Sequence, residues 1–147
     1  MDNCSHAYAA KHIVTRNMNL EGQDKPGTNV EYKRSSFVLN GAIVEGVFPA
    51  FDSYFTVMLP DHLRCASDAK QFRFCTRQLS QAIQNDPRLA YLFTSNQYEQ
   101  IRIGNPHIPG LTWHHNHVPG KMELVNANIH RHCGHTGGRY IWGGGKR

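Results

Sequence analysis

Histidines are concentrated in one short stretch near the end of the chain, where six of the ten lie within residues 113–135. A lone histidine is usually structural or exposed. So dense a group is hard to explain by packing, because each buried imidazole needs its own hydrogen-bond partner. Imidazole is a common protein ligand of zinc, nickel and related ions. We therefore predict a metal site drawn from His114, His115, His117, His130, His132 and His135.

The spacing of these histidines narrows the choice of ligands. Adjacent side chains on a strand point to opposite faces, so His114 and His115 cannot both bind one ion without distortion, and one of them must have a different role. Two later histidines flank a predicted helix end, so both can approach the strand from one side. The predicted ligands are His114, His130 and His135, and the alternatives are His117 and His132. Three protein ligands and an open position are typical of catalytic zinc, whereas structural zinc usually has four.

Positive charge is concentrated in the same part of the chain. The formal net charge is +5, and residues 1–100 hold equal numbers of basic and acidic side chains. The whole excess therefore lies in residues 101–147, where Glu123 is the single acidic residue. A basic surface of this kind favours a polyanionic partner such as a nucleic acid. The candidate phosphate contacts are Lys121, Arg131, Arg139, Lys146 and Arg147.

Other features of the sequence argue against several classes of protein. The four cysteines, at positions 4, 65, 75 and 133, form no CxxC pair, which disfavours a cysteine-built zinc ribbon or a disulfide framework. No stretch reaches the roughly 18–20 uncharged apolar residues of a membrane span. The first residues lack a basic segment followed by an apolar one, so we expect no ordinary signal peptide.

Short-range signals predict an α+β fold, beginning with a hairpin and a set of helices. Asn40-Gly41 is a preferred dipeptide for a tight type I′ turn, so residues 30–39 and 42–47 are predicted to pair. Three helices should follow, each starting where a polar side chain can cap the first turn. The predicted caps are Ser67, Asp86 and Thr94.

A second hairpin and a helix are predicted for the histidine-rich part of the chain. Residues 111–116 and 122–125 are expected to be its strands, and residues 126–133 its helix, followed by a glycine-rich coil. Elsewhere we expect a short helix near residues 6–12 and a buried irregular segment at 47–60, which two prolines interrupt.

Several short motifs together resemble the WHH branch of the HNH nucleases, which occurs as C-terminal toxin domains of bacterial polymorphic and contact-dependent inhibition systems. These motifs are TWHH at 112–115, GKMELV at 120–125, His130, HTGGR at 135–139 and IWGGG at 141–145. The resemblance implies an N-terminal hairpin and helical scaffold followed by a ββα-metal motif (HNH, or His-Me finger) at about residues 110–138. Residues 1–28 are polar and show no clear period, so we expect a lead-in there and a single nuclease toxin domain at 29–147.

The resemblance also implies a role for each histidine. His114, His130 and His135 would bind a divalent metal ion, and His115 would be the general base. We expect zinc, with nickel, manganese and magnesium as alternatives. Many HNH enzymes orient this base with an asparagine near the position of Met122. Neither Met122 nor its neighbour is an asparagine, which leaves as substitutes Asn116, Asn126 and Asn128.

The implied function is metal-assisted hydrolysis of phosphodiester bonds. Arg139 and Lys121 are the candidates for gripping the phosphate oxygens, and Arg139 is also counted as catalytic. We expect a DNase toxin, delivered as the C-terminal part of a larger secreted or surface-exposed protein into the target-cell cytoplasm and neutralised by a cognate immunity protein. The alternatives are an RNase with the same metal site and a non-catalytic, zinc-stabilised nucleic-acid-binding module.

Overall fold

A long hairpin forms the first sheet of the molecule. The computed structural model describes residues 10–145, in which β2 (Glu31–Leu39) pairs antiparallel with β3 (Ala42–Ala50). Asn40 and Gly41 have φ values of 50° and 80°, as a type I′ turn requires, so the predicted hairpin is confirmed. β3 continues beyond the predicted end, and Pro49 lies opposite Tyr32 in the register.

The segment before the hairpin packs against it. The short strand β1 (Lys11–His12) runs parallel to β3, and the 3-10 helix η1 (Met18–Leu20) follows. Isolated bridges then join Glu21 to Tyr32 and Asp24 to Glu31. The helix expected near residues 6–12 is wrong for Lys11–His12, which hydrogen-bond to β3 instead, and the rest of that stretch lies outside the described residues.

Helices cover the other end of the molecule. The 3-10 helix η2 (Asp61–Leu63) is followed by α2 (Asp68–Asn85). Its N-cap is Ser67, whose side chain accepts a hydrogen bond from the Lys70 amide. The other two predicted caps are also confirmed. Asp86 caps η3 (Pro87–Leu92), and Thr94 forms a complete capping box at the start of α3 (Ser95–Arg102).

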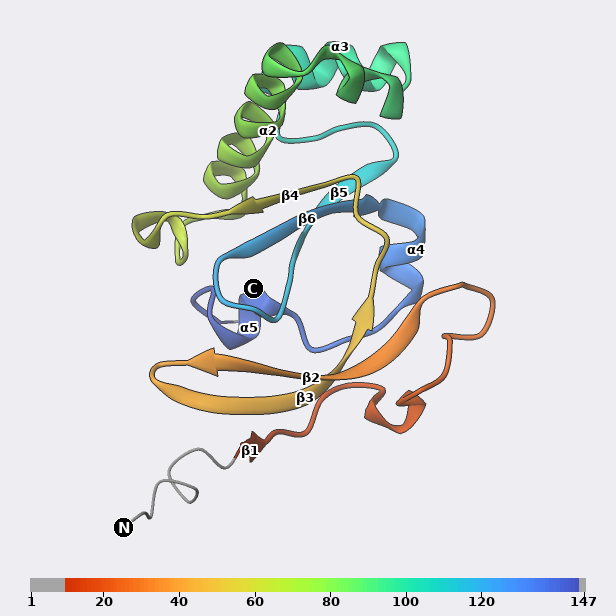
Figure 1. The fold of residues 1–147 in the computed structure, drawn as a ribbon, viewed down its shortest axis with the longest axis vertical. Helices are drawn as coiled ribbons and strands as arrows, with labels where there is room; N and C mark the ends of the chain where they lie inside the picture. The colour runs from red at the N-terminus through yellow and green to blue at the C-terminus, as the bar shows by residue number, and fades with distance from the viewer. Residues whose placement is uncertain (1–9, 146–147) are drawn as a thin grey trace.

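The second sheet lies between the helices and the first sheet (Figure 1). Its central strand is β6 (Lys121–Asn126), flanked by β5 (Leu111–His115) and β4 (Phe55–Met58), both antiparallel to it. The irregular segment predicted at 47–60 is therefore corrected, because β4 is a strand. Its partner β6 lies more than 60 residues further along the chain, which no local signal can indicate.

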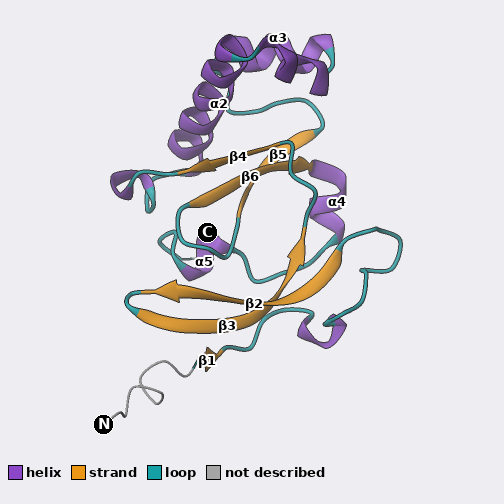
Figure 2. Cartoon of the chain, viewed as in Figure 1, coloured by secondary structure: helices purple, strands orange, loops and turns teal. Residues whose placement is uncertain are grey.

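Two short helices complete the described chain. α4 (Ala127–His132) follows β6 directly and is capped by Asn126, close to the predicted bounds. The glycine-rich coil expected after it contains a further helix, α5 (Gly138–Ile141), which lies between the two sheets in Figure 1. Figure 2 shows the resulting mixture of helices and antiparallel strands, which confirms the α+β class.

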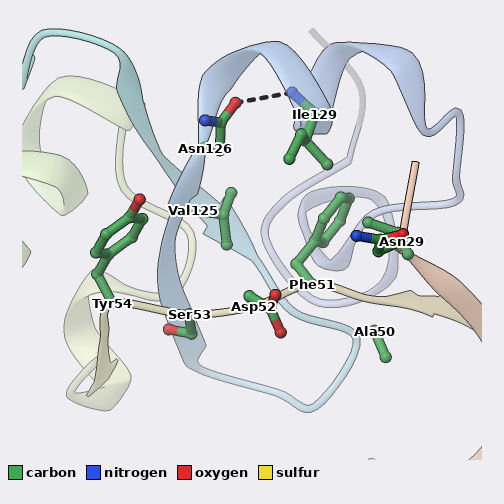
Figure 3. Close-up of a pocket in the computed structure, with 10 residues that line it drawn as sticks. Asn29, Ala50, Phe51, Asp52, Ser53, Tyr54, Val125, Asn126 and Ile129 are labelled. Atoms are coloured by element: carbon green, nitrogen blue, oxygen red, sulfur yellow. Dashed lines mark hydrogen bonds between the residues drawn. The ribbon is translucent and has the colours of Figure 1, made fainter. Parts of the chain in front are cut away.

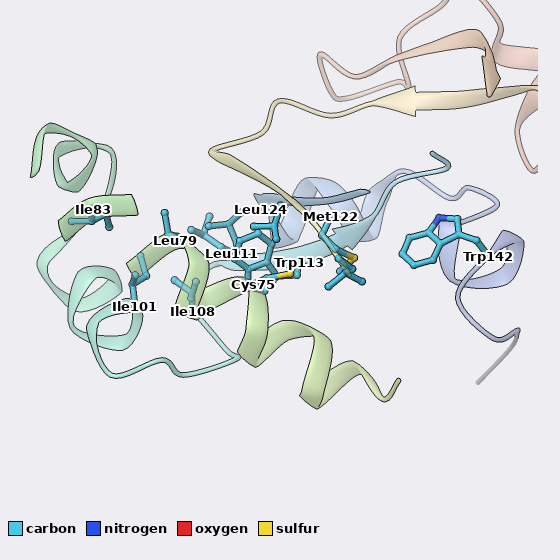
Figure 4. Close-up of a cluster of buried hydrophobic side chains, with 12 residues drawn as sticks. Cys75, Leu79, Ile83, Ile101, Ile108, Leu111, Trp113, Met122, Leu124 and Trp142 are labelled. Carbon is cyan, nitrogen blue, oxygen red and sulfur yellow. The ribbon is translucent and has the colours of Figure 1, made fainter. Parts of the chain in front are cut away.

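The largest apolar core joins α2 and α3 to the second sheet (Figure 4). Cys75, Leu79 and Ile83 on α2 pack with Trp113 of β5 and Leu124 of β6. The Trp113 indole also donates a hydrogen bond of 3.0 Å to the buried hydroxyl of Thr76 on the same helix. This core fixes β5, the strand that carries both adjacent histidines, against α2. None of the helices in residues 10–145 is sufficiently long and apolar to cross a membrane.

Candidate active site

Three imidazoles from separate elements meet at one end of β5. His114 lies on β5, His130 on α4 and His135 in the loop after α4, and their candidate ligand atoms all lie within 4.8 Å of one another. The Nδ1 of His114 is 3.1 Å from the Nε2 of His130. Two imidazole nitrogens on a tetrahedral zinc ion are about 3.3 Å apart, from a zinc–nitrogen distance of 2.0–2.1 Å. The donor set therefore fits a divalent metal ion.

The protein keeps these three rings neutral and oriented. Burial lowers the pKa of His114 well below its ordinary value, and it lowers the pKa of His130 to about 4 and that of His135 as well, with neighbouring charges adding to each shift. The Nδ1 of His135 lies 2.6 Å from the carbonyl oxygen of Cys133, which only accepts, so Nδ1 donates and Nε2 keeps its lone pair for a metal. Neutral imidazoles with such lone pairs are what metal binding requires.

A single aromatic ring forms the apolar wall of this cluster. The centroid of Phe51 lies 4.9, 5.3 and 5.6 Å from the rings of His114, His130 and His135, respectively. Phe51 also lines a pocket of about 250 Å³, together with Tyr54, Val125 and other residues (Figure 3). Phe51 is thus an apolar neighbour that all three imidazoles share.

The N-terminal segment holds the loop that carries His135. The Tyr32 hydroxyl and the Asn17 side-chain amide both donate to the carbonyl oxygen of Gly134, at 2.6 and 2.8 Å. The backbone amide of Arg16 donates to the Thr136 hydroxyl at 2.9 Å. The Arg16 guanidinium covers Gly134 so closely that a Cβ there would lie 2.6 Å from it. Sequence reasoning missed these contacts, because nothing local links positions more than 100 residues apart.

The second histidine of the adjacent pair faces the opposite side of β5, as predicted. His115 is buried and lies near the rings of Phe72 and Trp142, whose centroids are 5.8 and 5.6 Å away. Its Nε2 lies 2.7 Å from the Oε1 of Gln71 on α2 and 3.7 Å from a carboxylate oxygen of Asp68. His115 is near enough to the three clustered imidazoles to contribute to the lowered pKa values of His114 and His130.

Sequence reasoning also missed Gln71 and Asp68, although one signal was available. Gln71 lies four residues before Cys75 and eight before Leu79, so it belongs to the apolar face of the same helix. A fully buried polar side chain on such a face needs a specific partner. The helical period thus indicated that Gln71 is buried, but it did not indicate which residue Gln71 would contact.

Arg139 and Trp142 attach α5 to this side of the site. The guanidinium of Arg139 is 2.8 Å from Asp68, beside His115. The Trp142 indole donates to the carbonyl oxygen of Asn116 at 2.7 Å. A Cβ at Gly138 would overlap that same carbonyl oxygen, so only glycine allows α5 to approach the end of β5.

The alternative ligands lie elsewhere. His117 is stacked on Phe48 at 4.1 Å and shares a 2.8 Å hydrogen bond with Ser35, so it packs against the first sheet. His132 bonds the carbonyl oxygen of Asn128 on its own helix, at 2.7 Å. Neither belongs to the cluster of three imidazoles.

The three asparagines considered as orienting residues have other partners. Asn116 donates to Glu123 and accepts from the Val118 amide, Asn126 caps α4, and Asn128 accepts from Arg131.

The basic residues predicted to contact phosphate are spread over several elements. Lys121 is half-buried at the start of β6, and Arg131 is exposed on α4 beside His130. Arg139 is half-buried in its ion pair, and Lys146 and Arg147 lie outside the described residues.

Comparison with known families of proteins identifies a match over most of the chain. A family model described as the DNase/tRNase domain of colicin-like bacteriocins matches residues 40–137, about two thirds of the chain. The matched segment contains the three clustered imidazoles, His115 and Gln71. No curated protein and no solved structure matches the chain.

Proposed function

The chain belongs to the family of DNase/tRNase domains of colicin-like bacteriocins, and from this premise we propose that it is a metal-dependent endonuclease that hydrolyses DNA in target bacteria. The observation that carries the proposal is the cluster of His114, His130 and His135 with a second kind of histidine, His115, on the adjoining position of the same strand. Membership of the family makes the domain a nuclease toxin; the metal site suggests how it cleaves.

The order of elements supports a ββα-metal motif of the HNH type. β5 and β6 form an antiparallel pair, α4 follows without a loop, and together with the next loop they carry the three imidazoles. His114, His130 and His135 would hold the ion, for which we propose zinc, with nickel, manganese and magnesium as alternatives. When bound, the ion would neutralise charge on the scissile phosphate and on the leaving oxygen.

Side chains of the protein would accept the proton and bind the substrate. His115 accepts a proton from water, the water oxygen forms a bond to phosphorus, and the bond from phosphorus to one sugar oxygen breaks. That sugar oxygen takes up a proton from solvent water and leaves as a hydroxyl. Arg139, beside His115, and Lys121 are the proposed contacts of the phosphate oxygens, with Arg131, Lys146 and Arg147 binding flanking phosphates.

Cleavage assays with and without metal test the proposal. Plasmid DNA and total RNA are incubated with the protein after treatment with EDTA, and then with added Zn²⁺, Ni²⁺, Mn²⁺ or Mg²⁺. We expect EDTA to abolish plasmid cleavage and one of the added ions to restore it. Cleavage that is insensitive to EDTA would overturn the metal-dependent mechanism. Degradation of RNA alone would establish the RNase alternative, which the tRNase members of the family favour.

A non-catalytic binding module is the remaining alternative. Such a module would close its ion with a fourth protein ligand. Within residues 10–145 the cluster consists of three histidines, which favours an open position and therefore catalysis.

We also propose a protein partner and a route of delivery. A nuclease toxin endangers the cell that makes it, so a cognate immunity protein should accompany it, and the domain should reach the cytoplasm of its target from a larger secreted protein. Coexpression of neighbouring small open reading frames with the active domain tests this. At least one of them should protect the host, and protection by none would contradict the proposal.

A further inference from the structure

One buried glutamine connects the backbone before α2 to the histidine that we propose as the general base. Gln71 is fully buried, and its side-chain amide makes three hydrogen bonds. Its amide nitrogen donates to the carbonyl oxygens of Leu63 and Arg64, at 2.8 and 2.9 Å. Its amide oxygen lies 2.7 Å from the Nε2 of His115.

These contacts determine the orientation of the amide. Backbone carbonyl oxygens only accept hydrogen bonds, so the NH₂ group of Gln71 must face Leu63 and Arg64, and the reverse orientation would bring three oxygens together. The oxygen of the amide therefore faces His115.

The orientation of the amide in turn determines the tautomer of the imidazole. The Gln71 oxygen carries no hydrogen, so the hydrogen bond to His115 requires a proton on Nε2. In a neutral imidazole the lone pair then lies on Nδ1. A general base must present a lone pair to the water it deprotonates, so this tautomer makes Nδ1 the basic atom.

Asp68 does not take the place of Gln71 in this arrangement. Its carboxylate oxygen is 3.7 Å from the Nε2 of His115, which is too long for a hydrogen bond, and the same oxygen is 2.8 Å from Arg139. Asp68 lies one helical turn before Gln71, so α2 presents to His115 one hydrogen-bonding amide and, further away, one carboxylate. That carboxylate can stabilise the imidazolium formed after proton transfer.

We propose that Gln71 is the positioning residue of His115, holding its ring in the Nε2–H tautomer and in one orientation so that Nδ1 can accept a proton. The inference rests on the proposed nuclease function, and it assigns to a glutamine on α2 the role that the sequence led us to seek among the asparagines near β6.

The variant Gln71→Met tests this role, because methionine is similar in volume and cannot make the three hydrogen bonds. We expect kcat for plasmid cleavage to fall about 10- to 100-fold, as for other residues that orient a functional histidine. KM and the zinc content should remain close to those of the wild type, because Gln71 contacts neither the substrate nor the three clustered imidazoles.

Thr76→Val provides the matched control. Thr76 is also a fully buried polar residue of α2, and its hydroxyl accepts a hydrogen bond from β5, but from Trp113 rather than from His115. This variant loses a buried hydrogen bond between the same helix and strand, so it should lose stability while keeping kcat. An equal fall of kcat in both variants would mean that Gln71 only stabilises the packing of α2 on β5, and it would overturn the inference.

A spectroscopic measurement keeps the test independent of activity and of the folding of the variants. The ¹⁵N chemical shifts of the His115 ring in the wild-type protein should report a proton on Nε2 and none on Nδ1. The opposite tautomer would overturn the inference even if the protein cleaves DNA. If the wild type cleaves no nucleic acid, the proposed function fails, while the ¹⁵N shifts still decide whether Gln71 selects the tautomer.

Discussion

Two adjacent histidines on one strand have different surroundings, and this difference separates their proposed roles. His114 points to the other two clustered imidazoles and to Phe51, where lone pairs converge. His115 points to α2, where an amide and a carboxylate face its Nε2. The alternation of side chains along β5 is the physical cause, because it places consecutive residues on opposite faces.

Replacing each of these histidines should therefore have a different effect on bound metal. We expect His115→Ala to abolish cleavage and to retain close to the wild-type amount of zinc, because the three ligands are intact. His114→Ala should lose both the activity and the ion. Elemental analysis of the purified variants, alongside plasmid cleavage, distinguishes the two results. Loss of the ion from His115→Ala would make His115 a ligand and the proposed base wrong.

At the scale of elements, the loop after α4 and the short helix α5 both pack close to β5 and the candidate site. The loop after α4 is held by Tyr32 and Asn17 through the carbonyl oxygen of Gly134, one residue before His135. α5 is held against β5 because Gly138 permits a close approach to Asn116. Both attachments depend on residues that are not ligands themselves.

Tyr32→Phe should weaken metal binding by about 10-fold, the lower end of the loss found when the outer contacts of a metal site are removed. The variant keeps the buried ring but removes one of the two donors to Gly134, so the loop with His135 is less firmly held. Competition with a zinc-binding dye measures the affinity. Tyr140→Phe, at an exposed position on α5, is the control and should bind zinc like the wild type. Equal affinities in all three proteins would contradict the role of Tyr32.

Gly138→Ala should destabilise the domain by about 1–3 kcal/mol, because the added Cβ overlaps the Asn116 carbonyl and the Trp142 indole. Displacing α5 would also move Trp142 away from His115, so cleavage should fall too. Urea unfolding and plasmid cleavage measure the two effects.

The neighbouring glycine offers a matched control for this change. Gly137 has φ −86° and ψ 161°, which any residue adopts, and a Cβ there would meet its nearest neighbour, the His135 ring, at 3.8 Å. Gly137→Ala should therefore be tolerated. Equal stability of the two alanine variants would show that α5 can shift without cost.

At the scale of the whole molecule, the site is assembled from the N-terminal segment, α2 and the end of the described chain. Asn17, Gln71 and His135 lie far apart in the sequence, yet each contributes to one region around β5. The net charge, by contrast, is confined to one part of the chain, because the excess of basic side chains falls in residues 101–147.

This charge distribution predicts strongly salt-dependent binding to DNA. Each phosphate that is neutralised contributes about −0.9 to the slope of log K against log salt, so about three to five contacts would give a slope of about −2.7 to −4.5. Fluorescence anisotropy with the inactive His115→Ala variant measures it. Deleting residues 146–147 should weaken binding to all sequences and make the slope less steep. A slope near zero would mean that the basic residues do not contact the backbone.

Much of the fold and part of the site could be predicted from sequence because their signals are local. The Asn40-Gly41 turn and the caps at Ser67 and Thr94 each depend on a few consecutive residues. These features reflect backbone dihedral preferences and hydrogen bonds to the nearest amides, which the local sequence determines almost alone.

The tertiary structure decided everything that depends on which distant surfaces meet. β4 is a strand because its backbone pairs with that of β6. A sequence pattern interrupted by prolines does not indicate that partner. Gln71 reached His115 across 44 positions, and Tyr32 reached Gly134 across 102. Such contacts follow from the burial of apolar faces, which brings together polar groups that then must satisfy one another. The sequence by itself indicated which imidazoles could bind a metal, and packing determined how the proposed general base is held.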